Sequence, residues 1–555
     1  MKHHFFSWLF LFFLISHASA QLTPVQQQKI DSLFTKWNIP NHPGGTVGIM
    51  QNGKTVFSKA YGLASLEYLV PNTPQTLFNV ASVSKQFTAM GIVLLHLQGK
   101  VSLDADIRTY LPELPEFEAP VTLRHMLHHT SGLRSIHGLL ELAGWRADDA
   151  RNNKDLFRFM KQQQDLNFKP GSEYLYCNTG YMFMADIIEK VTGEKFAAWM
   201  KKSVFEPLGM PSTYVEDKYD RVVPNNATSY YPTREGFDRA VEYWGYVGSG
   251  NIHSNTQDLL SWLKNFHDPQ PGWEKAFTTL LTLDKLNNGE DNNYAFGLSL
   301  SEFNNVRRID HSGAIGGYRS FACTYPEQQL SIVVLTNFSN ANPAQKSDEI
   351  SNILLPPAKK TASPKVAVKT KKVRLSKKQL KSYEASYWNE EGNYARKIYV
   401  KNDTLRYFRT EDSESALIPL GNDEFRMADV PNDVKVSFNT DKNGLKTMMV
   451  TIDNGKPILS AVFEPVDPSK ADLSDYTGAF YSPELETTYT ISAADGKLSA
   501  HHARHGDFGM KILKKDVLEG EWPFNLVKFR RDNAGKVSSI LVTNGRVRNA
   551  WFEKR

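Results

Sequence analysis

The chain has 555 residues, of which 41% are hydrophobic and 23% are charged, a composition typical of a globular protein rather than a disordered one. The formal net charge is +5, but nine lysines and one arginine lie within residues 354–381 without an acidic residue, so the remainder is net acidic. Nucleic-acid binding is not expected, because the chain has no motif that interleaves basic and aromatic residues.

The first 20 residues have the order of a cleavable secretory signal. A weakly basic start is followed by an apolar core over residues 5–15 and by Ala18-Ser19-Ala20. The apolar run is shorter than the roughly 18 residues that a membrane span needs, and no cysteine follows at Gln21 to take a lipid. These features predict an exported protein, periplasmic or secreted, with a signal peptide at 1–20 and no membrane span.

Helix and strand signals mix through residues 21–355. Two β-rich runs flank Asn52-Gly53, which predicts a hairpin over 45–62. An apolar run at 330–337 predicts a core strand. Apolar spacing predicts helices at 24–37, 83–98, 121–129, 153–163, 181–202, 256–267 and 343–355. A hairpin early, helices between and strands late favour an α/β (α+β) domain, in which helices flank an antiparallel sheet.

Residues 356–378 are rich in Lys and Pro and predict an extended, solvated linker. Contact of this linker with an anionic cell-wall polymer is an alternative that the sequence leaves open.

The remaining β-rich part repeats itself after about 90 residues. The stretch 380–387 returns as 473–480, and 438–444 returns as 529–535 with Phe, Asp and Gly at the same spacings. Each copy has enough short runs for a small antiparallel β-barrel of about eight strands. Two barrels, over 379–467 and 468–555, are predicted; one barrel made from two halves is the alternative.

Ser82 and Lys85 form a Ser-x-x-Lys motif at the start of the helix predicted at 83–98. Residues three apart on a helix are neighbours on one face, and a serine at the helix start has its backbone N–H at the positive end. A serine hydroxyl becomes a nucleophile when a neighbour accepts its proton, and a lysine can do so when burial or positive charge lowers its pKa. Alone, the motif is weak, because a chain this long contains roughly a couple by chance.

Two further motifs follow in order, Tyr176-Cys177-Asn178 and His311-Ser312-Gly313. Together the three resemble the active-site motifs of the penicillin-recognising serine hydrolases, which include class C β-lactamases, D,D-carboxypeptidases, D-aminopeptidases and related esterases. The segments 122–133 and 248–263 match as well, so the resemblance covers about residues 25–350. It implies a β-lactamase-like domain over 21–355. By layout, the barrels look like the lipocalin-like barrels of D-aminopeptidases.

The resemblance implies a role for each matching residue. Ser82 attacks a carbonyl and forms an acyl-enzyme, while Lys85 holds the serine and shares its proton. Tyr176 is the base and then the acid toward the leaving group, and Asn178 orients Lys85 and binds the substrate amide. No cofactor and no metal are implied.

The third motif departs from the Lys-Thr-Gly of β-lactamases and carboxypeptidases. His311 is mostly neutral at pH 7, which disfavours substrates ending in a carboxylate and favours amides, esters or peptides recognised through their amino end. The resemblance places the oxyanion hole at the backbone N–H groups of Ser82 and Ala314. Gly313, which lacks a side chain, lets its strand approach the substrate.

Several alternatives stay open. The substrate is a small molecule or a short peptide, but peptidase, esterase and β-lactamase or D,D-carboxypeptidase activities share the same acylation machinery. No motif in the sequence reports the preference for D- or L-residues, the oligomeric state or the rate of deacylation. A binding or sensing module that has lost turnover is the alternative from a different class, and fold by itself does not decide among these functions.

Other residues have less specific patterns. His128 and His129 are expected to pack a loop rather than bind metal, and Cys177 is expected to pack inward. The aromatic residues of 243–246 line a substrate pocket or pack in the core. Residues 501–509 form either a solvent-exposed hairpin tip or a loop that limits substrate size. Cys177 and Cys323 permit at most one disulfide, and free, buried thiols are the alternative.

Overall fold

The computed structural model describes residues 21–357, 374–410, 413–428, 430, 433–453, 455–467 and 472–555. The predicted signal peptide, 1–20, and most of the predicted linker, 356–378, lie outside the described residues. The described residues form two compact units, the first within 1–105, 150–153 and 181–358 and the second within 106–149, 154–180 and 359–555.

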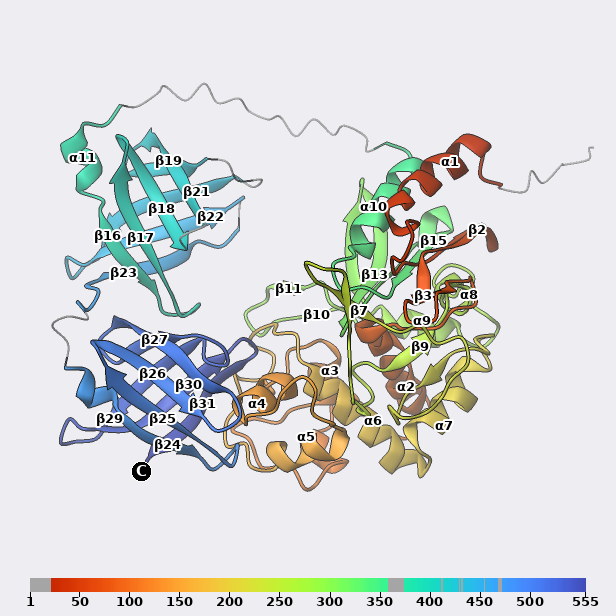
Figure 1. Ribbon diagram of the computed structural model, residues 1–555, viewed down its shortest axis with the longest axis horizontal. Helices are drawn as coiled ribbons and strands as arrows, with labels where there is room; N and C mark the ends of the chain where they lie inside the picture. The colour runs from red at the N-terminus through yellow and green to blue at the C-terminus, as the bar shows by residue number, and fades with distance from the viewer. Residues whose placement is uncertain are drawn as a thin grey trace, which may run out of the picture. The chain divides into compact units, whose positions relative to one another are not determined.

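The first unit is built on a six-stranded antiparallel sheet with the order β12-β13-β14-β15-β1-β2 (Figure 1). Its strands are β1 (Gly45–Gln51), β2 (Lys54–Tyr61), β12 (Ser299–Phe303), β13 (Val306–Ile315), β14 (Tyr318–Tyr325) and β15 (Leu330–Thr336). The predicted hairpin joins β1 to β2, and Asn52 and Gly53 both have positive φ, of 51° and 72°. The predicted core strand is β15, which is buried along its whole length.

Helices cover both faces of this sheet because side chains alternate along each strand. On β1, Val47 and Ile49 belong to the apolar cluster that includes Ile30 and Ile350 from two helices. Gly48 points the other way, where an added Cβ would meet the Thr256 side chain at 2.8 Å. The helices of this unit are α1 (Pro24–Ser32), α2 (Lys85–Leu97), α7 (Phe196–Met200), α8 (Thr256–Lys264), α9 (Glu274–Leu280), α10 (Pro343–Leu354) and, from Tyr181 onward, α6 (Asn178–Thr192).

The antiparallel sheet flanked by helices confirms the predicted fold class. Each predicted helix is present, and the one predicted at 181–202 is divided into α6 and α7 around Gly193, which has a φ of 73°. Shorter strands include β5 (Phe78–Asn79), β6 (Tyr214–Val215) and β9 (Ile252–Ser254), which pair in one small sheet. Two-stranded pairs join β3 (Leu63–Ser65) to β4 (Val70–Pro71), β7 (Tyr230–Pro232) to β8 (Phe237–Arg239), and β10 (Asp284–Lys285) to β11 (Asp291–Asn292).

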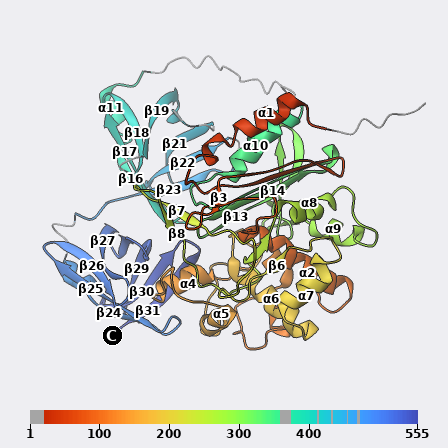
Figure 2. The same ribbon diagram turned by 45° about the vertical axis from the view of Figure 1, so that its right-hand side comes forward.

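The second unit holds α3 (Leu123–Leu127), α4 (Ile136–Leu142), most of α5 (Asn153–Met160), α11 (Lys377–Lys381) and two closed barrels of eight antiparallel strands (Figure 2). The first barrel comprises β16 (Ala385–Asn389), β17 (Tyr394–Lys401), β18 (Thr404–Thr410), β19 (Ser413–Gly421), β20 (Glu424–Met427), β21 (Val434–Thr440), β22 (Lys446–Ile452) and β23 (Ile458–Phe463). The second comprises β24 (Gly478–Ser482), β25 (Thr487–Ala494), β26 (Lys497–His502), β27 (Gly506–Lys514), β28 (Val517–Gly520), β29 (Leu526–Arg531), β30 (Val537–Asn544) and β31 (Val547–Lys554).

Each barrel closes on itself, because β16 pairs with β23 and β24 pairs with β31. The prediction of two barrels is therefore confirmed, and the alternative of a single barrel is wrong.

Equivalent residues of the sequence repeat make the same contacts in both barrels. The Tyr383 and Phe438 rings lie 5.0 Å apart, and the rings of their counterparts Tyr476 and Phe529 lie 4.9 Å apart. In the turn that follows, the carboxylate of Asp441 accepts hydrogen bonds from backbone N–H groups, and its counterpart in the second barrel does likewise. The repeat thus encodes one barrel core and one capped turn, each used twice.

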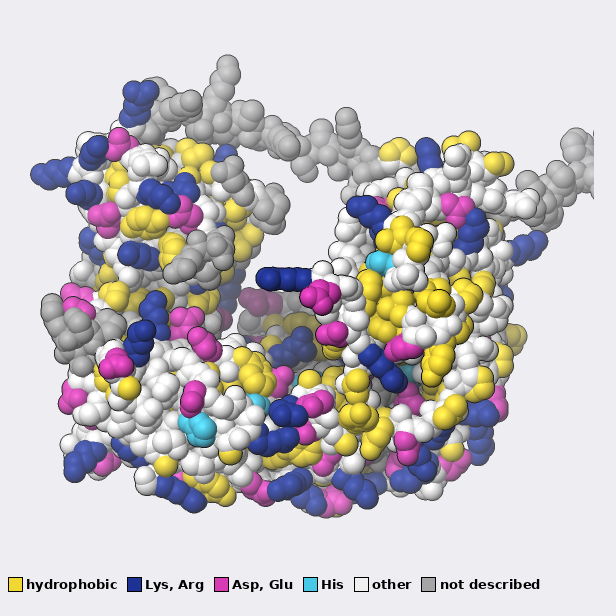
Figure 3. All heavy atoms as spheres, in the orientation of Figure 1, with side chains coloured by type: hydrophobic (Ala, Val, Ile, Leu, Met, Phe, Trp, Pro, Cys, Tyr) yellow, Lys and Arg dark blue, Asp and Glu magenta, His cyan; other side chains and the backbone are white. Residues whose placement is uncertain are grey.

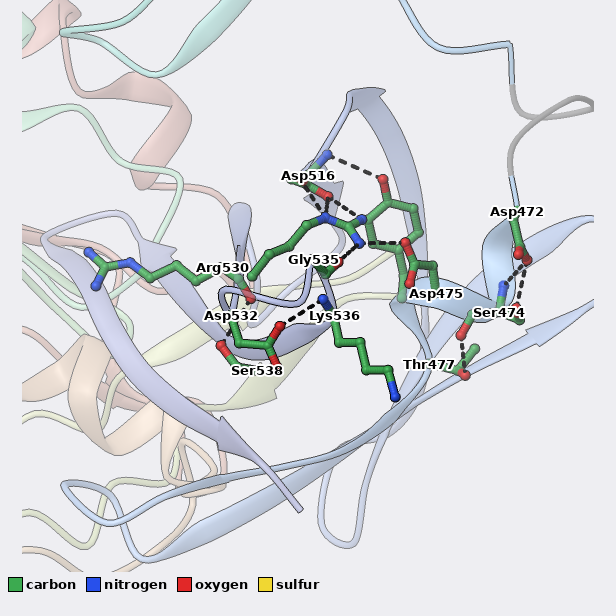
Figure 4. A network of polar contacts seen from close by, with 12 residues as sticks. Asp472, Ser474, Asp475, Thr477, Asp516, Arg530, Asp532, Gly535, Lys536 and Ser538 are labelled. Atoms are coloured by element: carbon green, nitrogen blue, oxygen red, sulfur yellow. Dashed lines mark hydrogen bonds and ion pairs between the residues drawn. The ribbon is translucent and has the colours of Figure 1, made fainter.

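The second barrel also has a charged network centred on Arg531 (Figure 4). Arg531 binds Asp475 at 2.6 Å and Asp516 at 2.7 Å, and it donates to the carbonyl of Gly535 at 2.8 Å. Thr440 occupies the equivalent position in the first repeat. The network ties the segment that leads into β24 to the β27–β28 turn and to the β29–β30 turn.

On the face drawn in Figure 3, basic and acidic side chains are interspersed over the described surface. Among the described residues, no helix has both the length and the apolar character needed to cross a bilayer.

Candidate active site

Ser82 lies in a 3₁₀ turn, Ala81–Ser84, and not in the α-helix that was predicted to begin near it. The helix α2 starts at Lys85, whose Nζ donates a hydrogen bond to Ser82 Oγ at 3.2 Å. Ala81 has a φ of 50°, a left-handed conformation that costs a non-glycine residue about 1 kcal/mol or more. Its N–H donates to Asn79 Oδ1 at 2.9 Å. The turn thus holds the serine in a strained and well-defined position.

Lys85 is completely buried, although its ammonium is a charged group. Its Nζ donates to the carbonyl oxygen of Ser249 at 2.6 Å and lies 5.5 Å from the centre of the Tyr181 ring. A buried ammonium is tolerated only when it is hydrogen-bonded. Ser249 belongs to the segment 248–263 that the sequence singled out, whereas no sequence signal marked Tyr181 beyond its place three residues after Asn178.

The third motif lies on β13, next to the first motif, within the same unit. A Cβ added to Gly313 would lie 2.3 Å from the carbonyl oxygen of Val80 and 2.3 Å from Ser320 Oγ. Only glycine fits there, because real Cβ contacts are not that short. The following residue, Ala314, is exposed on the strand. The structure therefore brings Ser82, Lys85 and the His311–Ala314 segment together.

His311 is 5% exposed, and burial followed by the charge of Lys85 lowers its pKa from the ordinary 6.5 to about 4. Its Nδ1 lies 2.6 Å from the carbonyl oxygen of Ser312, which can only accept a hydrogen bond, so Nδ1 carries the proton. Nε2 then accepts from the hydroxyl of Tyr294 at 2.9 Å. His311 is a neutral hydrogen-bonding group at physiological pH, with its tautomer set by the Ser312 carbonyl, and no sequence signal marked its second partner, Tyr294.

His311→Gln will change the pH dependence of stability in a defined direction. A histidine whose folded pKa is lowered contributes stability above its unfolded pKa of 6.5, and this contribution is lost as pH falls toward 4. The difference in unfolding free energy between wild type and variant will therefore shrink by about 3 kcal/mol from pH 7 to pH 4. Urea titrations at both pH values measure it, and a constant difference would contradict a buried, neutral His311.

The second motif lies in the second unit and is held by the segment 128–134. The ring of Tyr176 lies 4.1 Å from the ring of His129, and His129 Nδ1 accepts a hydrogen bond from the N–H of Cys177 at 3.1 Å. The hydroxyl of Thr179 donates to the carbonyl of Arg134 at 2.7 Å. The expectation that His129 has a packing role is confirmed, and the motif it packs is the catalytic candidate. Asn178 then begins α6, the helix whose first turn carries Tyr181.

Other candidate residues have varied outcomes. Tyr243 and Trp244 line a cavity of about 330 Å³ in the first unit, together with Glu242, whereas Tyr246 is buried in the core. Both cysteines are buried, free thiols. No group of side chains suited to a metal ion occurs in the described ranges.

The loop 501–509 of the second barrel packs against the end of α4 and the segment that follows it. Arg504 binds Asp149 at 2.7 Å, and His505 Nε2 lies 2.9 Å from the carbonyl oxygen of Glu141. Its tip is thus in contact with protein, and its influence on substrate size stays a prediction.

Comparison with known proteins assigns these features to a family. The family model described as Beta-lactamase matches residues 31–355. A D-aminopeptidase from Gluconobacter oxydans is 29% identical over 300 residues, which are 54% of this chain and 56% of that protein, so the match spans little more than half of its length. A D-aminopeptidase from Cereibacter sphaeroides is 26% identical over 473 residues, 83% of each chain.

A solved structure shares the fold. The octameric penicillin-binding protein homologue from Pyrococcus abyssi superposes with a TM-score of 0.55 at 24% identity, covering 78% of this chain and 99% of that one.

Proposed function

The chain belongs to the beta-lactamase family, and from this premise we propose that it is an exported serine hydrolase that cleaves amide or peptide bonds through an acyl-enzyme on Ser82. The observation that carries the proposal is the hydrogen bond of 3.2 Å between the buried Lys85 Nζ and Ser82 Oγ. A buried lysine beside a serine hydroxyl is one of the arrangements that activate a serine for nucleophilic catalysis.

The proposed reaction has two halves. In the first, Ser82 Oγ attacks the substrate carbonyl, and its proton passes through Lys85 to Tyr176. The backbone N–H groups of Ser82 and Ala314 stabilise the oxyanion, each worth about 3 kcal/mol of barrier. Tyr176 then gives the proton to the leaving amine as the C–N bond breaks. In the second half a water molecule adds to the ester carbonyl, and Ser82 leaves with the proton of that water.

The surrounding residues would serve this chemistry without reacting themselves. Asn178 would bind the substrate amide and orient Lys85. Gly313 would let β13 lie close to the turn that carries Ser82, since atoms of Val80 and Ser320 occupy the position of its Cβ. His311 would offer a neutral hydrogen bond in place of the cation of a Lys-Thr-Gly motif.

A peptidase like the D-aminopeptidases is favoured over the other activities of the family. The support is the similarity to a D-aminopeptidase over 83% of the chain, a span that includes barrel residues as well as the hydrolase domain. Esterase and β-lactamase or D,D-carboxypeptidase activities are the second candidates, since all proceed through the same acyl-enzyme.

The proposal is tested by the intact mass of the mature protein after treatment with a serine-reactive phosphonate, for wild type and Ser82→Ala. We expect one adduct on wild type and none on the variant, because only an activated serine reacts at neutral pH. Ser58→Ala is the matched control, since Ser58 is exposed on β2 and has no proposed role in acylation. Labelling of that variant should equal labelling of wild type.

An adduct on Ser82→Ala would contradict the assignment of the nucleophile. No adduct on either protein would favour the binding or sensing module, and a ligand rather than a substrate would then be sought.

A further inference from the structure

A hairpin of the second barrel contacts the second motif within the second unit. The turn between β30 and β31 carries Arg546, whose guanidinium carbon lies 4.8 Å from the centre of the Tyr176 ring. His129 lies against the same ring, at 4.1 Å between the centres of the two rings. A guanidinium stacked on an aromatic ring is attracted by the electrons of the ring and keeps its N–H groups available at its edge.

The hairpin is fixed in place and is not a loose loop. The carbonyl of Arg546 accepts hydrogen bonds from Asn167 Nδ2 at 2.9 Å and from the N–H of Ser135 at 3.2 Å. Val547 is buried against Gly138, where an added Cβ would meet a methyl group of the valine at 2.7 Å. The backbone on which the Arg546 side chain stands is therefore held from both sides of the turn.

The guanidinium of Arg546 makes no ion pair with any carboxylate in the part of the chain that the structure describes, and its side chain is exposed. Arg548, two residues later, differs in this respect because it binds Glu173 at 3.0 Å. Arg548 is thus paired with a carboxylate of the protein, whereas Arg546 presents a positive charge beside Tyr176 that can bind a ligand.

We propose that Arg546 binds a carboxylate on the leaving-group side of the substrate. This inference rests on the proposed function, in which Tyr176 delivers a proton to the leaving amine; a group stacked on Tyr176 then faces the departing part of the substrate. The planar fork of an arginine matches a carboxylate through two parallel hydrogen bonds. The barrel would thereby supply the cation that His311 does not, and short peptides with a free carboxyl end become the preferred class of substrate.

The test compares two substrates that differ only in this charge, a dipeptide of D-alanine and glycine and the same dipeptide as its C-terminal amide. The quantity measured is the ratio of kcat/KM for the acid to kcat/KM for the amide. In Arg546→Gln we expect this ratio to fall about 10-fold or more, the worth of a lost hydrogen bond to a charged group. Arg546→Lys should retain part of it, because the charge remains but the fork is lost.

Lys536→Gln is the matched control, since it removes one positive charge from an exposed turn of the same barrel. An unchanged ratio in this variant separates a local contact from a general effect of net charge. An unchanged ratio in Arg546→Gln, with hydrolysis that still depends on Ser82, would overturn the role of Arg546 and leave the proposed function intact.

A binding measurement separates the two proposals if neither dipeptide is cleaved. Calorimetry on Ser82→Ala and on the double variant Ser82→Ala/Arg546→Gln needs no turnover. Weaker binding of the acid, but not of the amide, to the double variant would support Arg546 even though the proposed hydrolysis had failed. Equal binding to both proteins would overturn the role of Arg546.

Discussion

Lys85→Met will lower kcat/KM by about 10³-fold, as the loss of a group that takes part in proton transfer does, and will leave the protein as stable as before or more stable. Lys85 is buried, and its ammonium bonds to Ser82 Oγ and to the carbonyl of Ser249. Methionine has a similar length and no charge, so it fills the same space without a group that can move the proton of Ser82. Activity and stability are therefore expected to change independently.

The stability half of this prediction follows from two opposing costs. Burial of an ammonium costs several kcal/mol before its hydrogen bonds offset that cost. Methionine removes the cost of burying an ammonium. It also leaves the Ser249 carbonyl without the hydrogen bond from Lys85 Nζ, at a cost of about 1–3 kcal/mol. The unfolding free energy should consequently stay the same or rise by about 1–2 kcal/mol.

Initial rates of hydrolysis of a peptide amide measure the change in activity, and urea unfolding curves measure the change in stability. The control for a lost surface charge is Lys100→Met, because Lys100 is exposed. A fall in stability by more than about 3 kcal/mol would mean that Lys85 is mainly structural. Full activity in Lys85→Met would exclude it from the acylation step.

Glu484→Ala will destabilise the second unit by about 3–5 kcal/mol, because it leaves a buried arginine without its counter-ion. Arg134 Nη1 and Glu484 Oε2 lie 2.9 Å apart, and the two side chains are 1% and 2% exposed. Burial raises the pKa of Glu484 even though Arg134 lies beside it. The pair is therefore costly to bury and more costly to break.

The neighbours of Arg134 explain why it cannot move to solvent once Glu484 is lost. Its Nε and Nη2 donate to the carbonyls of Arg548 and Asn549 on β31, at 3.1 Å and 3.0 Å. Its own carbonyl accepts the hydrogen bond from Thr179. The second barrel is thus joined through one side chain to the segment that positions the second motif, and loss of the ion pair should also lower the rate of phosphonate labelling.

Glu486→Ala provides the matched control. This carboxylate is two residues away and also contacts an arginine, Arg158, but the two side chains are 34% and 57% exposed. Exposed ion pairs contribute about 0–1 kcal/mol, so this variant should unfold almost as wild type does. The double variant Arg134→Met/Glu484→Leu should recover most of the lost stability, since it removes both buried charges. Equal effects of Glu484→Ala and Glu486→Ala would contradict the account.

Local patterns in the sequence determined the helices and strands and located the three motifs. The Asn52-Gly53 turn, the apolar spacing of α2 and the hydrophobic run of β15 depend on neighbours within a few residues, so periodicity reveals them. The repeat behind the two barrels was also visible, because the same core and turn residues recur after about 90 positions. Ser82 and Lys85 could be recognised as a pair because a spacing of three positions on one helical turn brings two side chains together.

The environment of these residues was decided only by the tertiary structure. The lowered pKa of His311 arises from burial beside Lys85, 226 positions away along the chain. Ser82 lies in a 3₁₀ turn ahead of α2, next to Ala81 with its positive φ, whereas the sequence predicted that it lies at the start of a helix. Arg134 and Glu484 are 350 residues apart, and Arg546 and Tyr176 are 370 apart. Such pairs have no period along the chain. They form only where folding brings distant segments together and removes the water between them, so burial and long-range charge contacts could be assigned only from the folded structure.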